Sequence, residues 1–594
     1  MCGIAGIYAY GKNASPVDQG ELLRMRETML SRGPDGAGIW MSEDHRVGFA
    51  HRRLAIIDLS EDGAQPMFDA DTGNWIVFNG EIYNHNKLRV ELNQDGILTK
   101  SKCDTEVLLK LYAQKGPAML QLLRGMFAFA IWDARKQAMF FARDAFGMKP
   151  LYIADDGSTL RFASQVKTLL AESVDTRPDP AGHAGFLLWG SVPEPYTLYR
   201  GIRAFPAGHW MYVTEGKVGR ATAFSSPLLG LREVKRAMPE STEVAIAQIA
   251  NAVRDSVAAH MVADVPVAVF LSAGLDSAML AASAASIGDL RTLTLGFDEY
   301  SGTINDETLL AKEVAKNLGA SHTQYNISAA DFAKDREDLL AAMDQPSIDG
   351  VNTWFVAKAA AQNGLKVAIS GIGGDELFGS YPSFRQVPRL KNMLQGISSS
   401  PMLGKLVRKS IAPFTGILSS PKYAGLLEYG GSLQGAYMLR RALYMPWELA
   451  SIMDPEMAAE GLLELSTMEA LAASIEGLNS DRLAVSALEM QWYMKNQLLR
   501  DADWAGMAHS VEIRVPFVDM ELLRHYVEMP TLGLGQEKPI IARAVAPHLP
   551  ESLLNRPKTG FSIPTQRWLN PNSPQTIGNL REWAQMLYGE FVAG

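Results

Sequence analysis

The apolar residues of this chain follow two different patterns, one up to about residue 214 and the other from about residue 241. The first part alternates short β-type runs with turns, whereas the second part alternates strands with helices. A chain of 594 residues also exceeds the size at which a single hydrophobic core stops growing. We therefore predict two domains, 1–214 and 241–594, joined by a poorly patterned linker over 215–240.

The N-terminal part is predicted to be an α+β domain of packed sheets. Its β-type runs, such as 74–78 and 138–142, are separated by Gly, Asp and Asn residues that favour turns. Two helical patterns, 19–30 and 105–115, interrupt these runs.

The second part is predicted to be an α/β domain with a doubly wound parallel sheet. The continuous apolar run 265–271 is typical of a strand buried on both faces, and it leads through small residues into a helix over 278–286. Further strands are expected at 291–297 and 366–370. Such sheets bind ligands at the carboxyl ends of their strands. From about residue 388 onwards the pattern is mainly helical.

Charge and cysteine content narrow the range of partners. The chain has 65 acidic and 56 basic residues and no long Lys/Arg block, so we expect no nucleic-acid partner. Its two cysteines, Cys2 and Cys103, cannot form a disulfide framework, which favours a reducing compartment. Without a signal-peptide pattern or an apolar run of roughly 20 residues, we expect a cytoplasmic protein with no membrane partner.

Cys2 directly follows Met1, so removal of Met1 would leave one residue with both a thiol and an α-amine. Such an amine, with an ordinary pKa of about 7.7–8.0, can accept the proton of the thiol. The residue can therefore supply nucleophile and general base together. Alone this position is weakly informative, because a cysteine after Met1 is often incidental.

Five motifs surround Cys2 in the sequence and make its position specific. They are Cys2-Gly3-Ile4-Ala5-Gly6, Arg32-Gly33-Pro34-Asp35, His51-Arg52-Arg53-Leu54, Asn79-Gly80-Glu81-Ile82-Tyr83-Asn84 and Cys103-Asp104-Thr105-Glu106. In this order they resemble the class II glutamine amidotransferases over nearly all of 1–210. The resemblance implies an Ntn-hydrolase-like fold of stacked antiparallel sheets that hydrolyses glutamine to ammonia.

The resemblance also implies which residues carry the chemistry. Cys2 would attack the glutamine amide, while the side-chain amide of Asn79 and the backbone N–H of Gly80 would stabilise the resulting oxyanion. Arg53 matches the family residue that binds the α-carboxylate of glutamine.

Two carboxylates, Glu81 and Asp104, match the residues that bind the α-ammonium group of glutamine. We interpret His51, Arg52 and Cys103 as structural, since no chemical task follows for them.

In the second part, the loop Ser272-Ala273-Gly274-Leu275-Asp276-Ser277 lies between a buried strand and a helix. Small and hydroxylated residues at a helix N-terminus favour anion binding. The loop resembles the pyrophosphate loop of the N-type ATP pyrophosphatases and lacks the Gly-Lys-Ser/Thr ending of a Walker loop. It departs from that pattern at Ala273, where glycine is usual, so we expect phosphate binding with altered geometry.

A second loop, 370–379, follows the strand at 366–370 and so lies on the same edge of the sheet. The resemblance implies that Asp276 and Asp375 hold Mg²⁺ against the pyrophosphate of ATP. Lys558 matches a lysine that contacts the leaving pyrophosphate. The implied ATP- or pyrophosphate-binding residues are Leu271, Ser272, Gly274, Asp276, Ser277, Leu295, Ser370, Gly371 and Lys558. The segment 511–519 also matches, and we interpret it as a structural ion-pair segment.

Nearly the whole chain thus resembles the glutamine-hydrolysing asparagine synthetases. The resemblance implies adenylation of a carboxylate by ATP with Mg²⁺, release of AMP and pyrophosphate, and amidation by ammonia from glutamine. Glutamine, ATP and a carboxylate, aspartate by default, are the expected partners. We expect an enclosed path for ammonia and leave open whether the chain forms a homodimer.

The residues expected around the acceptor carboxylate depart from the family pattern at two places. Ile372 stands where well-characterised family members usually have glutamate, and 349–354 lacks an arginine found there in some members. Ile372 and Trp354 would suit another acid, such as a uronic acid, a peptide carboxylate or a secondary-metabolite acid. An ATP-dependent cyclase, a non-enzymatic scaffold and a free glutaminase are further alternatives, but each accounts for fewer of the motifs.

Overall fold

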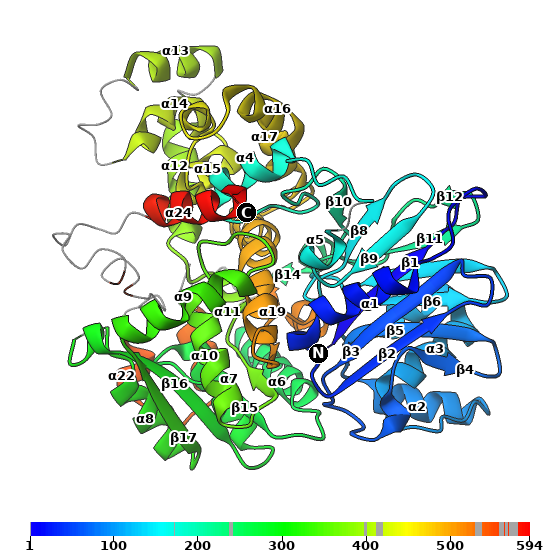
Figure 1. Ribbon diagram of the computed structural model, residues 1–594. Helices are drawn as coiled ribbons and strands as arrows, with labels where there is room; N and C mark the ends of the chain where they lie inside the picture. Colours follow the sequence, from blue (N-terminus) through cyan, green and yellow to red (C-terminus); the bar gives the residue numbers. More distant parts are fainter. Residues whose placement is uncertain are drawn as a thin grey trace.

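In the computed structural model, a sheet-rich N-terminal half lies beside a helix-rich C-terminal half (Figure 1). The structure describes residues 2–170, 173–236, 241–303, 305–396, 401–411, 420–528, 537–556, 564, 568 and 580–593. Within these residues no helix is long and apolar enough to cross a membrane.

Two antiparallel sheets form the N-terminal half. One has the strand order β10-β8-β9-β1-β3-β2 and the other β12-β11-β7-β6-β5-β4, with β13 also paired to β11. The strands of the first sheet are β1 (Gly3–Tyr8), β2 (Gly36–Met41), β3 (Val47–Arg53), β8 (Tyr152–Asp155), β9 (Leu160–Ala163) and β10 (Ile202–Ala204). Those of the second are β4 (Met67–Asp69), β5 (Asn74–Ile82), β6 (Gly125–Asp133), β7 (Ala138–Arg143), β11 (His209–Thr214), β12 (Lys217–Val218) and β13 (Thr222–Ala223).

The two sheets are stacked, because Ile4 and Phe49 of one sheet share a buried cluster with Val77 and Phe141 of the other. Helix α1 (Gln19–Thr28) packs on the outer face of the first sheet. Helices α2 (His85–Gln94) and α3 (Asp104–Lys115) pack on the outer face of the second. The predicted α+β domain of stacked antiparallel sheets is therefore confirmed.

The segment predicted as a linker, 215–240, contains secondary structure that joins both halves. Strands β12 and β13 extend the second N-terminal sheet. Helix α5 (Pro227–Glu233) then contacts α20 (Met520–His525), and β14 (Lys235–Arg236) pairs in parallel with β20 (Val527–Glu528).

A parallel sheet with the strand order β17-β16-β15-β18-β19 organises the C-terminal half. Its strands are β15 (Val267–Phe270), β16 (Arg291–Phe297), β17 (Ser321–Ile327), β18 (Val367–Ile369) and β19 (Glu512–Arg514). Val267 and Val269 of β15 face one buried cluster and Ala268 faces another, so helices cover both faces of the sheet. This confirms the predicted doubly wound parallel sheet.

Helices α6 (Thr242–His260), α7 (Leu275–Ala285) and α21 (Glu537–Val545) contribute to the first of these clusters. Helices α9 (Ala329–Ala342), α10 (Val351–Gln362) and α19 (Arg500–Met507) contribute to the second. The other described helices are α4 (Pro180–Trp189), α8 (Thr308–Asn317), α11 (Gly374–Phe378), α12 (Ser383–Leu394), α13 (Pro401–Ile411), α14 (Leu426–Tyr429), α15 (Leu433–Arg441), α16 (Pro455–Leu465), α17 (Thr467–Ala473), α18 (Asp481–Leu488), α22 (Glu551–Leu554) and α24 (Leu580–Ala593). A π-helical segment, η10 (Glu489–Leu499), connects α18 to α19.

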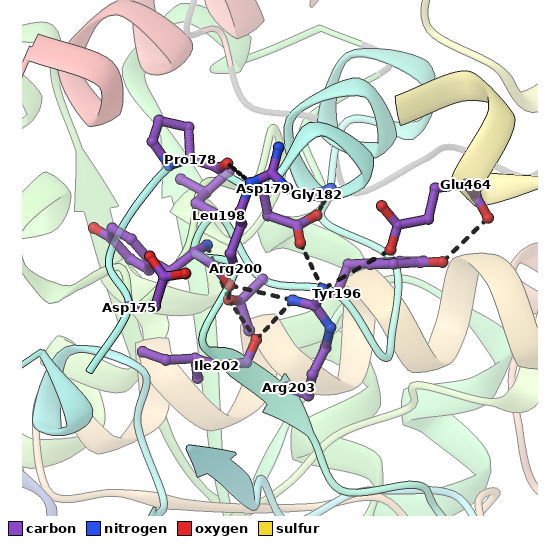
Figure 2. Close-up of polar contacts among 12 residues, drawn as sticks. Asp175, Pro178, Asp179, Gly182, Tyr196, Leu198, Arg200, Ile202, Arg203 and Glu464 are labelled. Carbon is purple, nitrogen blue, oxygen red and sulfur yellow. Dashed lines mark hydrogen bonds and ion pairs between the residues drawn. The ribbon is translucent and has the colours of Figure 1, made fainter. Parts of the chain in front are cut away.

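Helix α4 attaches the two halves at a second place. Asp179 caps α4 by accepting a hydrogen bond from Gly182 N at 2.7 Å, and it forms an ion pair with Arg203 at 2.7 Å (Figure 2). The hydroxyl of Tyr196 donates to the carbonyl oxygen of Glu464, on α16, at 3.2 Å. The two halves are therefore held together by contacts as well as by the connecting chain.

Candidate active sites

Cys2 is buried just before β1, next to Asn79 of β5 in the other sheet. The backbone nitrogen of Cys2 donates to Asn79 Oδ1 at 3.0 Å. Because this nitrogen is a donor, the oxygen of the amide must face it, and the amide nitrogen points elsewhere. That nitrogen, Asn79 Nδ2, is buried and has no hydrogen-bond partner among the described residues. An unsatisfied donor beside a nucleophile is what an oxyanion hole requires.

Gly80 permits a close approach of β5 to β6. A Cβ atom at this position would lie 2.1 Å from the carbonyl oxygen of Met126. Any other residue would therefore force β5 away from β6 at the position that follows Asn79.

The thiol of Cys2 is not ionised by its surroundings alone. Burial raises the pKa of Cys2, and the hydrogen bond with the backbone of Leu54 and, more weakly, the guanidinium of Arg53 oppose this rise. A general base is therefore needed, as expected for an N-terminal cysteine. Arg53 itself donates through Nη1 to the carbonyl oxygen of Ser60 at 2.7 Å and through Nη2 to that of Asp58.

The two carboxylates expected to bind the α-ammonium group lie near each other at the end of β5. Asp104 begins α3 and accepts a hydrogen bond from Ile82 N at 3.0 Å. Glu81 is buried, and its Oε2 atom has no hydrogen-bond partner among the described residues. Burial raises the pKa of both carboxyl groups. A positive ligand group would favour their charged forms.

Arg514 of β19 connects Glu81 to the C-terminal half. Its Nη2 atom lies 3.6 Å from Glu81 Oε1, and its Nε donates to Glu512 Oε1 at 2.6 Å. Its carbonyl oxygen accepts from Ser370 N at 2.8 Å, at the start of the second loop. The ion pair predicted within 511–519 is present and also reaches both candidate sites.

Arg32 forms a second buried link between the halves. Its Nε donates to the carbonyl oxygen of Cys2 at 3.1 Å, and its Nη1 and Nη2 donate to Asp503 of α19 at 2.7 and 3.1 Å. This bidentate ion pair, together with the hydrogen bond to the Cys2 carbonyl oxygen, connects Cys2 to the C-terminal half. The motif containing Arg32 was identified from sequence, but its partner on α19 was not.

A cavity of about 590 Å³ lies at the carboxyl edge of the parallel sheet. Every sequence-predicted ATP or metal residue that the structure describes lines it: Leu271, Ser272, Gly274, Asp276, Ser277, Leu295, Ser370, Gly371 and Asp375. Lys558 lies outside the described residues.

The two loops approach each other because glycines line their contact. A Cβ atom at Gly371 would lie 2.9 Å from Asp276 Cβ, and one at Gly374 would lie 2.3 Å from Asp276 Oδ1. Within the first loop, Ser272 N donates to Ser277 Oγ at 3.1 Å. The backbone of Ala273 has no positive φ, so alanine occupies this position without strain.

Lys538 of α21 lies between the two predicted metal ligands. Its Nζ donates to Asp276 Oδ2 at 2.5 Å and to Asp375 Oδ1 at 2.6 Å. Two carboxylate oxygens therefore converge on one cationic atom, and such oxygens are ligands that fit Mg²⁺. Sequence reasoning missed Lys538, which follows Asp375 by more than 150 residues in a helix without a recognisable motif.

Other acidic residues lie in the same cavity. Burial raises the pKa of Glu376 to about 8 and that of Asp501 to about 7, so these groups carry less negative charge than their number suggests. Ile372 also lines the cavity. Trp354 does not, contrary to expectation: it is buried among core helices, with its ring 4.4 Å from that of His509.

Two family models match the chain. The glutamine amidotransferase domain matches residues 1–224, and asparagine synthase matches residues 248–586. The chain belongs to the glutamine-hydrolysing asparagine synthetase family. The prediction of this family and of its ligase class is confirmed.

Several curated relatives match this family member over nearly its whole length. Asparagine synthetase [glutamine-hydrolyzing] 1 of Bacillus subtilis is 31% identical over 98% of this chain and 90% of its own. A putative asparagine synthetase of Mycobacterium tuberculosis is 31% identical over 100% and 91%. An amidase, chry2, of Gibberella zeae is 27% identical over 97% and 90%.

Proposed function

We propose that this protein hydrolyses glutamine at Cys2 and uses the ammonia to amidate a carboxylate that it adenylates with ATP. L-Aspartate is the default acceptor. The proposal is carried by the contact of Cys2 with Asn79, whose amide nitrogen is left as a buried donor. The convergence of Asp276 and Asp375 in the large cavity supports the second reaction.

In the first half-reaction the α-amine of Cys2 accepts the thiol proton, and Sγ bonds to the amide carbon of glutamine. Asn79 Nδ2 and the N–H of Gly80 donate to the oxyanion that forms. Ammonia then leaves with a proton from the α-amine. Water cleaves the thioester to release glutamate. Arg53 and the nearby acids orient the substrate through its α-groups.

In the second half-reaction an oxygen of the acceptor carboxylate bonds to the α-phosphorus of ATP as the bond to pyrophosphate breaks. Asp276 and Asp375 would hold Mg²⁺, which supplies charge neutralisation to the polyphosphate. Lys538 holds these carboxylates together and adds positive charge at the same place. Ammonia then attacks the acyl carbon, loses a proton, and displaces AMP.

Ammonia must pass between the sites without protonation in bulk water, so we propose an enclosed path between the two halves. Two buried ion pairs between the halves, Arg32 with Asp503 and Arg514 with Glu81, support this proposal, because they close the contact between the halves beside Cys2.

The decisive experiment measures pyrophosphate release with ATP, Mg²⁺, ammonia and a panel of acids. We expect AMP and pyrophosphate, with asparagine formed from aspartate. The second candidate function is amidation of another acid, and the presence of Ile372 in the cavity favours it. Silence with aspartate and a strong signal from another acid would select that alternative.

A further inference from the structure

The candidate ATP cavity contains a pair of neighbouring carboxyl groups, Asp349 and Asp501. Asp501 lies in the first turn of α19, and Asp349 directly precedes Gly350, the residue that begins α10 as its N-cap. A Cβ atom at Gly350 would lie 3.0 Å from Asp501 Cγ, and the φ of 87° at this position also favours glycine. Glycine at position 350 therefore allows the Asp501 carboxyl group to approach the backbone next to Asp349.

Two hydrogen bonds fix the orientation of the Asp501 carboxyl group. Its Oδ1 accepts from Trp504 Nε1 at 2.7 Å, and its Oδ2 accepts from Ser347 Oγ at 2.8 Å. Since a carboxylate has about four acceptor positions, each oxygen keeps one position for a proton. Burial and the neighbouring Asp349 raise the pKa of Asp501 to about 7, although the two hydrogen bonds and the charge of Arg500 oppose the rise. At neutral pH this group can therefore both accept and release a proton.

The other acidic side chains among the described lining residues have other tasks. Asp276 and Asp375 are the predicted metal ligands. Glu376 follows Asp375 in the chain and is fully buried, and Glu307 lies 3.9 Å from the guanidinium of Arg556. The pair next to Gly350 is therefore the part of the cavity where a carboxyl group is left for the acceptor and for ammonia.

Formation of an amide in this cavity requires a group that accepts a proton. When ammonia bonds to the acyl carbon, its nitrogen becomes positively charged. Until that nitrogen loses a proton it is itself a good leaving group, so the intermediate returns to the acyl-adenylate instead of releasing AMP. A positioned base removes this proton and typically contributes about 10²–10⁴ to the rate. Ile372, which lines the cavity, is apolar and cannot accept it.

Helix α19 places Asp501 between the two candidate active sites. Asp503, on the same helix, binds Arg32, and Arg32 donates to the carbonyl oxygen of Cys2. Asp501 lines the cavity two residues earlier. Ammonia that travels from Cys2 along this contact therefore reaches the cavity beside Asp501.

We propose that Asp501 is the catalytic base that takes the proton from the attacking ammonia, with Asp349 as its positioning partner. This inference rests on the proposed function. The nitrogen lone pair forms the bond to the acyl carbon, and the carbonyl electrons move to oxygen. One proton passes from nitrogen to a carboxylate oxygen of Asp501. The carbonyl then re-forms, and the bond to AMP breaks with its electron pair on the phosphate oxygen. Asp501 finally releases the proton to water.

Asp501→Asn tests this proposal in single turnovers with protein in excess over ATP, with Mg²⁺ and each acid of the panel described above. Asparagine fits the site, because its oxygen can accept from Trp504 while its nitrogen donates to Ser347, whose hydroxyl can reverse its role. Pyrophosphate formed without a nitrogen source reports adenylation and should stay near the wild-type rate. Amide formed with ammonia should fall by about 10²-fold or more. Hydroxylamine is less basic than ammonia, so its charged nitrogen loses a proton to water more readily, and hydroxamate formation should fall by less than about tenfold.

Ser347→Ala is the matched control, since it removes one hydrogen bond to Asp501 but keeps the carboxyl group, and it should form amide within about tenfold of the wild-type rate. Equal losses with ammonia and hydroxylamine in Asp501→Asn would overturn the assignment. So would loss of adenylation in Asp501→Asn, or a loss in Ser347→Ala as large as that in Asp501→Asn, although the proposed amidotransferase function would then stand. Absence of pyrophosphate release by the wild-type protein with every acid, while it still hydrolyses glutamine, would instead refute the adenylation reaction and this inference with it.

Discussion

Replacement of Asn79 by alanine tests the glutaminase site most directly. In the structure, one side-chain amide performs two tasks: Oδ1 accepts the hydrogen bond from Cys2 N, and Nδ2 is left as a buried donor. Asn79→Ala removes both. Asn79→Asp retains an oxygen for Cys2 N but removes the donor, so the pair of variants separates orientation of Cys2 from stabilisation of the oxyanion.

The size of the effect follows from the role of the donor. Loss of one oxyanion-hole donor costs about 2.7–4 kcal/mol, or roughly 10²–10³ in kcat. We therefore expect Asn79→Asp, which loses only the donor, to lower glutamine hydrolysis by about this factor. Asn79→Ala, which also loses the acceptor for Cys2 N, should lower it further. Ammonia-dependent pyrophosphate release should remain near the wild-type rate, because the second site lies in the other half of the chain.

Glutamate formation and pyrophosphate release, measured in parallel, give both rates on the same preparation. Asn84→Ala is a suitable control, since Asn84 binds the carbonyl oxygen of Leu122 at 2.8 Å and accepts from Arg124 N at 3.0 Å. Retention of more than about one tenth of glutaminase activity in Asn79→Asp would refute the oxyanion role, because it falls far short of the expected loss.

Three further changes test other parts of the proposal. Cys2→Ala should abolish glutamine-dependent turnover and preserve ammonia-dependent turnover, and intact-mass measurement should show active wild-type protein without Met1; normal glutamine consumption by the variant would contradict this. Asp276→Asn and Asp375→Asn should each stop formation of AMP and pyrophosphate while glutamine hydrolysis persists, and detection of ADP and phosphate as wild-type products would disprove adenylation. Burial raises the folded pKa of Asp501 to about 7, above the ordinary value of about 3.9, so the folded state binds the proton more tightly. The stabilisation that protonated Asp501 gives is complete below about pH 3.9 and is lost as the pH rises towards 7. The unfolding midpoint of Asp501→Asn, compared with that of the wild type, should therefore rise between these two pH values. A difference that stays constant with pH would contradict the reasoning.

The order of local patterns in the sequence was sufficient to predict both folds. Short β-type runs separated by turn residues predicted the stacked sheets, and the apolar run before Ser272 predicted a buried parallel strand. Because the carboxyl ends of parallel strands meet at one edge, the sequence also predicted that Asp276 and Asp375 would lie together. The structure brings them together on one lysine.

Contacts between distant segments could be decided only by the tertiary structure. Lys538, Asp503 and Arg514 lie in helices or strands whose sequences contain no pattern that points to Asp375, Arg32 or Glu81. Their pairing depends on how the two halves pack, since each contact spans more than 150 residues of the chain.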